Sequence, residues 1–145
     1  MGRQGDEGPT VSPLRMAERG DADAGSVDVR RLPAVADMLA PGEEPVDIAW
    51  RIEGGSTAEG RPMLSIALTG TLPLVCQRCL ATFAWPLARQ TRVLLARDDA
   101  ELASLDEMVD DEVILGSAKV GAHALVGDEL LLTLPFAPVH PAACP

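Results

Sequence analysis

Hydrophobic and polar residues alternate along three stretches in the middle of the chain. This period of two, carried by Val, Ile, Leu and aromatic residues, is typical of strands with one buried face. The glycine-rich run Gly54-Gly55-Ser56 is expected to end the first strand. The three predicted strands cover residues 46–52, 64–74 and 83–95.

The second and third predicted strands flank Cys76-Gln77-Arg78-Cys79, so we expect them to pair as a long hairpin with this knuckle at its tip. Pro73 and Pro86 interrupt the two strands. Because proline has no backbone N–H to donate to a neighbouring strand, both positions are expected at sheet edges or bulges.

Two short helices are predicted on either side of these strands. Apolar residues between Leu32 and Leu39 recur at helical spacing, Pro33 suits a first helical turn, and Pro41-Gly42 would end the helix. A second helical pattern runs over residues 120–134 and stops at Pro135. The predicted fold is therefore α+β, mainly an antiparallel sheet with a long hairpin around a Cys-x-x-Cys knuckle and two short flanking helices.

Two segments show no clear period. Residues 1–25 are rich in Gly, Asp, Arg and Ser and bury little apolar area, which predicts a mostly flexible N-terminal arm before a single domain over residues 26–145. Residues 98–112 are acidic with few apolar anchors. They are expected to form an exposed loop that leads into a short strand at residues 112–115.

The chain is strongly acidic, with a formal net charge of −10. From Val93 onward the sequence contains ten acidic residues but only two basic ones, Arg97 and Lys119. Binding to a phosphate backbone needs clustered Lys and Arg, so direct RNA binding is expected to be weak or indirect. A basic protein is the better electrostatic partner.

Composition also limits compartment and activity. No apolar stretch reaches the ~18 residues of a membrane-spanning helix, and no apolar signal region follows the first residues, so we expect a cytoplasmic protein without a membrane partner. The sequence has no Gly-rich phosphate loop and no Gly-x-Ser-x-Gly motif. We therefore predict no enzymatic activity and no catalytic residue.

Cys76 and Cys79 are spaced so that both sulfurs can approach one tetrahedral metal ion. Two other interpretations of this pair stay open, a redox dithiol and plain buried cysteines. The redox interpretation is weakened because a thioredoxin-type pair begins a helix, whereas this pair lies between strands.

A second ligand pair is available near the end of the sequence, where four positions separate His140 from Cys144. Together with Cys76 and Cys79 these residues would form a structural Cys3His zinc site. A surface histidine remains the alternative for His140. His123 has no cysteine or second histidine nearby in sequence, so we expect it in solvent or in the core.

Two motifs together resemble the YceD-like family of large ribosomal RNA subunit accumulation proteins. These are Leu74-Val75-Cys76-Gln77-Arg78-Cys79-Leu80 and the run Asp-Glu-Leu-Leu-Leu-Thr-Leu-Pro-Phe-Ala-Pro-Val-His over residues 128–140, followed by Cys144. The similarity extends upstream through residues 12–20 and 25–29, so it covers nearly the whole chain in the family's order.

This resemblance implies a non-enzymatic factor for the accumulation or processing of large-subunit (23S) ribosomal RNA and for biogenesis of the large subunit. It places Cys76, Cys79, His140 and Cys144 as the candidate ligand set, and Glu129 with residues 130–135 at a characteristic helix end. The alternatives are a zinc-stabilised protein-interaction module unrelated to ribosomes and a dithiol redox enzyme.

Overall fold

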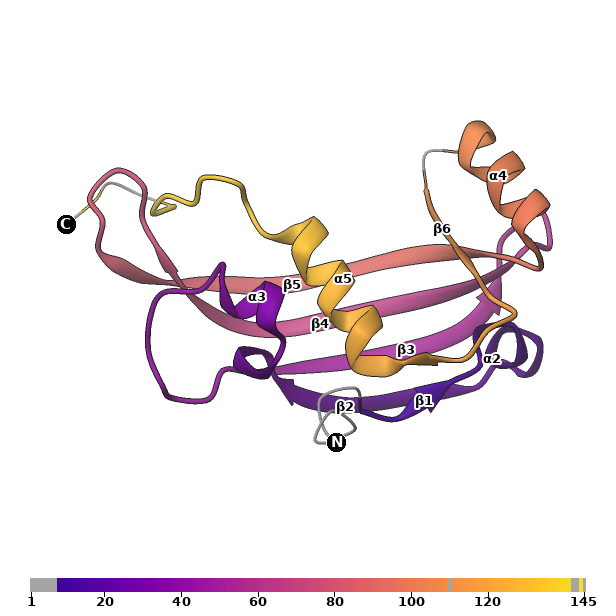
Figure 1. The fold of residues 1–145 in the computed structure, drawn as a ribbon, viewed down its shortest axis with the longest axis horizontal. Coiled ribbons are helices and arrows are strands. Elements are labelled where there is room, and N and C mark those ends of the chain that lie inside the picture. Colours follow the sequence, from indigo (N-terminus) through magenta and orange to yellow (C-terminus); the bar gives the residue numbers. More distant parts are fainter. Residues whose placement is uncertain (1–7, 110, 142–143, 145) are drawn as a thin grey trace.

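The protein folds around one five-stranded sheet, seen in a computed structural model that describes residues 8–109, 111–141 and 144 (Figure 1). The strand order is β2-β3-β4-β5-β6, and a separate two-stranded sheet pairs β1 with β7. All neighbours in the large sheet are antiparallel except β5 and β6, which are parallel. The elements in chain order are β1 (Thr10–Val11), α2 (Pro13–Arg19), β2 (Ala22–Asp28), the 3-10 helix η1 (Val29–Arg31), α3 (Pro33–Ala36), β3 (Asp47–Ser56), β4 (Pro62–Val75), β5 (Thr82–Ala96), α4 (Asp99–Met108), β6 (Glu112–Leu115), β7 (Val120–Gly121) and α5 (Ala122–Thr133).

The predicted α+β fold and its long hairpin are confirmed. β4 and β5 pair without interruption from Met63 opposite Leu94 to Val75 opposite Thr82.

The predicted places of both prolines are confirmed too. β3 pairs with β4 only as far as Thr69, and β6 pairs with β5 only from Val93 onward. Pro73 and Pro86 therefore lie where each strand has a single neighbour and a missing N–H costs no ladder hydrogen bond.

One face of the sheet carries the core, and α5 crosses this face diagonally (Figure 1). Buried residues alternate with more exposed ones along β3 and along most of β4, as the sequence pattern predicts. The helix contributes Leu125, Val126 and Leu130 to the same apolar cluster. Full burial of such a side chain contributes roughly 1.5–3 kcal/mol, so this contact is a main source of stability. The largest fully buried sheet residues are Ile48, Ile52, Leu64, Ile66, Leu68, Leu72, Leu74 and Leu95.

Both predicted flanking helices are present. α3 begins at Pro33, as expected from proline at a first helical position, and ends at Ala36 before the Pro41-Gly42 pair. α5 begins two residues later than predicted and ends at Thr133, just before Pro135. The part of the chain that the structure describes contains no helix long and apolar enough to cross a membrane.

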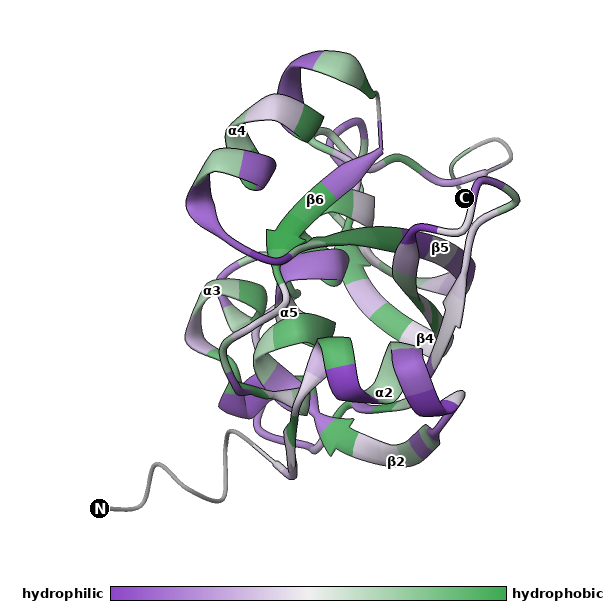
Figure 2. Cartoon of the chain, turned by 90° about the vertical axis from the view of Figure 1, so that its right-hand side faces the viewer, coloured by the Kyte–Doolittle hydropathy of each residue, from purple (hydrophilic) through white to green (hydrophobic). Residues whose placement is uncertain are grey.

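The acidic segment after β5 is not the exposed loop that the sequence suggested, because Asp99–Met108 form helix α4. The Asp98 carboxylate caps this helix by accepting a hydrogen bond from the Glu101 backbone N–H at 2.8 Å. Acidic residues in the first turn also suit the positive end of the helix dipole. Leu105 anchors α4 to the core, and Figure 2 shows hydrophilic residues along the helix.

The strand predicted at Glu112–Leu115 is confirmed as β6. It runs parallel to β5, and this arrangement requires a crossover connection, which α4 provides. The backbone N–H of Gly116 then donates to the Ala96 carbonyl at 2.8 Å and extends the contact between the two strands.

The prediction of a flexible arm over residues 1–25 is wrong for residues 10–25, which form β1, α2 and the first part of β2. Residues 1–7 lie outside the described residues. Met16 on α2 is buried in the main core. A side chain at Gly54 would overlap the Met16 carbonyl, so this glycine lets α2 lie directly against β3. Contrary to the prediction, Gly54 does not end β3, because residues 54–56 stay paired with β4 and the strand continues to Ser56.

Candidate metal centre

The tip of the β4–β5 hairpin positions two cysteines. Cys76 follows β4 directly, and its backbone N–H donates to the Ala81 carbonyl at 2.9 Å. The Leu80 N–H donates to the Cys76 carbonyl at 2.7 Å. Leu80 has a left-handed φ of 65°, which is uncommon for leucine, and this conformation closes the turn. The knuckle therefore folds back on itself and brings Cys79 near Cys76.

The segment after α5 returns to this knuckle and positions the second pair of residues. The Gln77 N–H donates to the Pro138 carbonyl at 2.8 Å. The His140 ring packs on Phe83 of β5 with ring centroids 4.7 Å apart. Arg78 donates from Nη2 to the His140 carbonyl at 3.4 Å. These contacts tie His140 to the hairpin although about sixty residues separate them in sequence.

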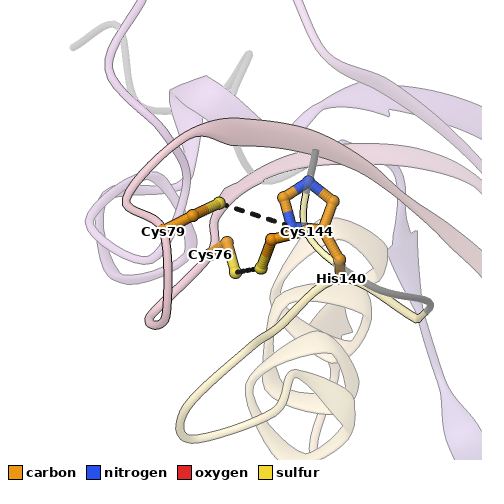
Figure 3. Close-up of side chains that lie close together, drawn as sticks. All are labelled: Cys76, Cys79, His140 and Cys144. Carbon is orange, nitrogen blue, oxygen red and sulfur yellow. Dashed lines mark hydrogen bonds between the residues drawn. The ribbon is translucent and has the colours of Figure 1, made fainter.

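The structure brings together all four residues that the sequence singled out (Figure 3). One ligand atom from each of Cys76, Cys79, His140 and Cys144 lies within 4.8 Å of the other three. The Sγ atoms of Cys76 and Cys144 are 3.6 Å apart, and so are Cys79 Sγ and His140 Nδ1. Cys76 is buried, Cys79 is exposed, and the other two are half-buried. This cluster can hold a metal ion.

The surroundings change the acidity of two of these thiols in opposite directions. Burial alone raises the pKa of Cys76, but backbone N–H groups of Cys79, His140 and Arg78 and the His140 ring stabilise its thiolate and lower the pKa to about 5. Burial raises the pKa of Cys144 to about 11, and its hydrogen bonds and charge repulsion with Cys76 and Cys79 add to this rise. The lowered pKa favours the thiolate of Cys76, which is the form that binds metal.

His123 is not part of this four-residue cluster. Its ring meets Trp50 edge-on, with ring centroids 6.0 Å apart. The half-buried histidine therefore contacts a buried core tryptophan, and the core is one of the two environments that the sequence predicted for it.

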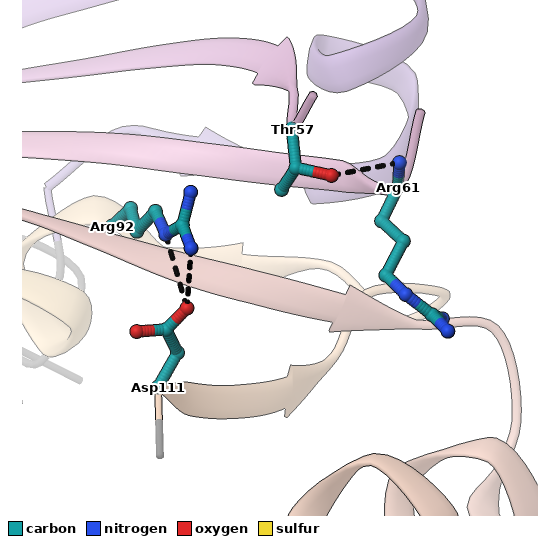
Figure 4. A network of polar contacts seen from close by, with 4 residues as sticks. All are labelled: Thr57, Arg61, Arg92 and Asp111. Carbon is teal, nitrogen blue, oxygen red and sulfur yellow. Dashed lines mark hydrogen bonds and ion pairs between the residues drawn. The ribbon is translucent and has the colours of Figure 1, made fainter. Parts of the chain in front are cut away.

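A second polar cluster lies between β5, β6 and α5 around a cavity of about 240 Å³. Glu129 is only 2% exposed, and it lines this cavity together with Glu112. Burial, the Glu112 contact and charge repulsion raise the pKa of Glu129 to about 8, and the Arg89 charge opposes them. Beside this pair, Arg92 donates to Asp111 at 2.8 Å (Figure 4).

Sequence reasoning did not find the Glu112–Glu129 pair, although the resemblance drew attention to Glu129. The signal in the sequence was an acidic residue among the buried positions of an apolar helix. Its partner could not be foreseen, since the contact depends on where β6 joins the sheet.

Comparison with known protein families gives a match. The family model described as "Large ribosomal RNA subunit accumulation protein YceD" matches residues 64–145, more than half of the chain. The chain belongs to the YceD family. No curated protein and no solved structure gives a significant match.

The YceD match begins in β4 and extends through the rest of the chain, so it includes the hairpin, α5 and all four residues of the cluster. The family description links the YceD proteins to accumulation of the large ribosomal RNA subunit. The match begins after α2, β2 and β3, although these elements complete the same sheet and core.

Proposed function

We propose that this protein acts as a non-enzymatic factor in the accumulation of large-subunit (23S) ribosomal RNA and in biogenesis of the large ribosomal subunit. The observation that carries this proposal is the YceD family match over residues 64–145. We expect the protein to act in the cytoplasm, where it meets ribosomal precursors.

We further propose that the four-residue cluster binds a structural zinc ion. A tetrahedral zinc ion with ordinary bond lengths needs about 3.8 Å between two sulfur ligands and about 3.6 Å between a sulfur and a nitrogen. The two measured separations, both 3.6 Å, fit these values. Cysteine and histidine are the ligands that zinc prefers.

A structural site suits a binding protein better than an enzyme. Catalytic zinc keeps an open position for water or substrate, whereas structural zinc has four protein ligands. Here three thiols and one imidazole complete the set. Zinc would join the hairpin tip to the segment after α5 and so hold the surface around them in one shape.

The direct partner is proposed to be a basic ribosomal or assembly protein. Helix α4 lies at one end of the molecule (Figure 1), and its exposed residues Asp99, Asp106 and Glu107 carry negative charge. Such a surface attracts a positively charged partner and repels RNA phosphates. Contact with RNA is therefore expected to be weak or to pass through the protein partner.

Depletion of the protein tests this function. We expect the ratio of large-subunit to small-subunit RNA to fall, and precursors of the large subunit to accumulate in sucrose gradients. Re-expression of the natural protein should restore the ratio. If both RNAs and both subunit peaks stay normal after depletion, the proposed function is wrong.

The second candidate is a zinc-stabilised interaction module that acts outside ribosome biogenesis. It is favoured by the exposed apolar side chains near the cluster, Leu80 at 72% and Phe136 at 101%. Large exposed apolar residues often mark protein contacts. Cosedimentation separates the two candidates, because only the ribosomal factor should travel with precursors of the 50S subunit.

A further inference from the structure

The three thiols of the metal cluster are not equivalent. Cys76 and Cys144 have their sulfur atoms 3.6 Å apart. Cys79 instead has the ring nitrogen of His140 at the same distance. A disulfide bond is about 2.05 Å long, so a movement of roughly 1.6 Å would join the first two sulfurs.

We propose that Cys76 and Cys144 form a disulfide when the protein meets a hydroperoxide, and that this cross-link expels the metal ion. The metal-release step rests on the zinc site proposed above, whereas the cross-link needs only the two thiols. On oxidation, the link between the hairpin and the segment after α5 would thus change from a bound metal ion to a disulfide.

The chemistry can be written with all atoms and electrons balanced. Cys144 is the half-buried sulfur of the pair, while Cys76 has no exposed surface. Cys144 therefore meets the peroxide, whose O–O bond breaks as one oxygen joins the sulfur to give a sulfenic acid and the other leaves as water or alcohol. The Cys76 thiolate then attacks the Cys144 sulfur, the S–S bond forms and the S–O bond breaks, and the leaving hydroxide takes a proton from solvent to become water.

The product differs from that of a redox enzyme with a Cys-x-x-Cys motif. There the two cysteines of the motif cross-link to each other. Here the geometry favours a bond between one knuckle cysteine and a residue distant in sequence, and Cys79 stays a free thiol. Two of the four ligands are consumed, and the remaining Cys79 and His140 are too few to retain a structural zinc ion.

Peroxide treatment of the full-length protein, loaded with zinc, tests the proposal. Free thiols counted after denaturation should fall from three to one, and non-reducing peptide mapping should find Cys76 joined to Cys144. A zinc-sensitive dye should report release of one ion for each cross-link. C79S should still form the cross-link, whereas C144S should lose this product.

Each result has a distinct meaning. A Cys76–Cys79 disulfide as the main product, or disulfides between molecules, would overturn the proposal. The cross-link proposal would also be wrong if the zinc-loaded protein kept all three thiols after peroxide treatment. The zinc proposal would be unaffected by that result. If the purified protein contains no zinc but forms the Cys76–Cys144 bond, the zinc proposal fails and the cross-link stands. Peptide mapping of the wild-type protein distinguishes these outcomes even if a variant misfolds.

Discussion

The almost fully buried carboxyl of Glu129 on α5 lies beside that of Glu112 on β6, and this neighbour helps to raise the pKa of Glu129 to about 8. Two carboxylates side by side repel each other, so the protonated form of the buried one is favoured. Arg89, Asp128 and the Arg92–Asp111 ion pair lie around the two carboxyl groups. The stability of the folded state is therefore expected to depend on pH.

Because the pKa of Glu129 rises from 4.5 to about 8 on folding, the folded state binds more protons than the unfolded state between these values. This contribution to stability is fully present below pH 4.5 and is lost as pH rises toward 8. We therefore expect the wild-type Tm to fall from pH 5 to pH 8. Glu129→Gln should flatten this slope, whereas Glu59→Gln on an exposed turn should leave it unchanged. Thermal melts across this range provide the measurement.

The packing of α5 on the sheet can be tested at two neighbouring leucines. Leu130 has no exposed surface, so Leu130→Ala should lower the free energy of unfolding by about 2–5 kcal/mol. Leu132 is 65% exposed, and its replacement by alanine should change stability by no more than about 0.5 kcal/mol. Urea unfolding measures both. Equal effects at the two positions would mean that α5 does not lie on the sheet as described.

The cap of α4 predicts a smaller effect. Asp98→Ala removes the acceptor for the Glu101 N–H and should cost about 1 kcal/mol of stability. Asp106→Ala, at an exposed position within the helix, is the matched control and should cost less. Hydrogen exchange should also speed up in the first turn of α4 in the Asp98 variant alone. If Asp99–Met108 show no protection from hydrogen exchange in the wild-type protein, this segment is the loop that the sequence suggested.

The zinc proposal predicts that metal and folding are coupled. Protein purified without added zinc should contain about one ion per chain, and a strong chelator should lower its Tm. His140→Asn should weaken zinc binding, whereas His123→Asn, on the other histidine, should keep the metal content. Elemental analysis measures the zinc. A metal-free protein whose stability does not respond to chelators would remove the case for a metal centre.

The proposed basic partner predicts a salt-dependent complex. Neutralising Asp99, Asp106 and Glu107 together should reduce the amount of basic protein that copurifies and make the rest less sensitive to salt, since exposed charges are screened beyond about 8 Å at physiological ionic strength. Neutralising Glu43, Glu44 and Glu59, which are exposed elsewhere, controls for net charge. If both triple variants retain the partner equally, α4 is a solvated helix without a docking function.

The sequence predicted the hairpin, the edge positions of its prolines and the clustering of the four candidate ligands well, because these depend on short-range alternation and spacing. It failed for α4, where a carboxylate cap and a single apolar anchor, Leu105, were enough for a helix. It also failed at Gly54, which appears as a strand breaker until α2 is seen lying against it. The parallel pairing of β6 depends on a crossover that no local pattern encodes.

The separation of the two ligand pairs along the chain affects how the protein unfolds. Residues 80–139, between Cys79 and His140, include β5, α4, β6, β7 and α5. A metal ion at the cluster therefore closes a long loop that contains much of the domain. Long closed loops restrict an unfolded chain most strongly in the chain-entropy description. The ion would thus act on the denatured ensemble as well as on the hairpin tip that it touches.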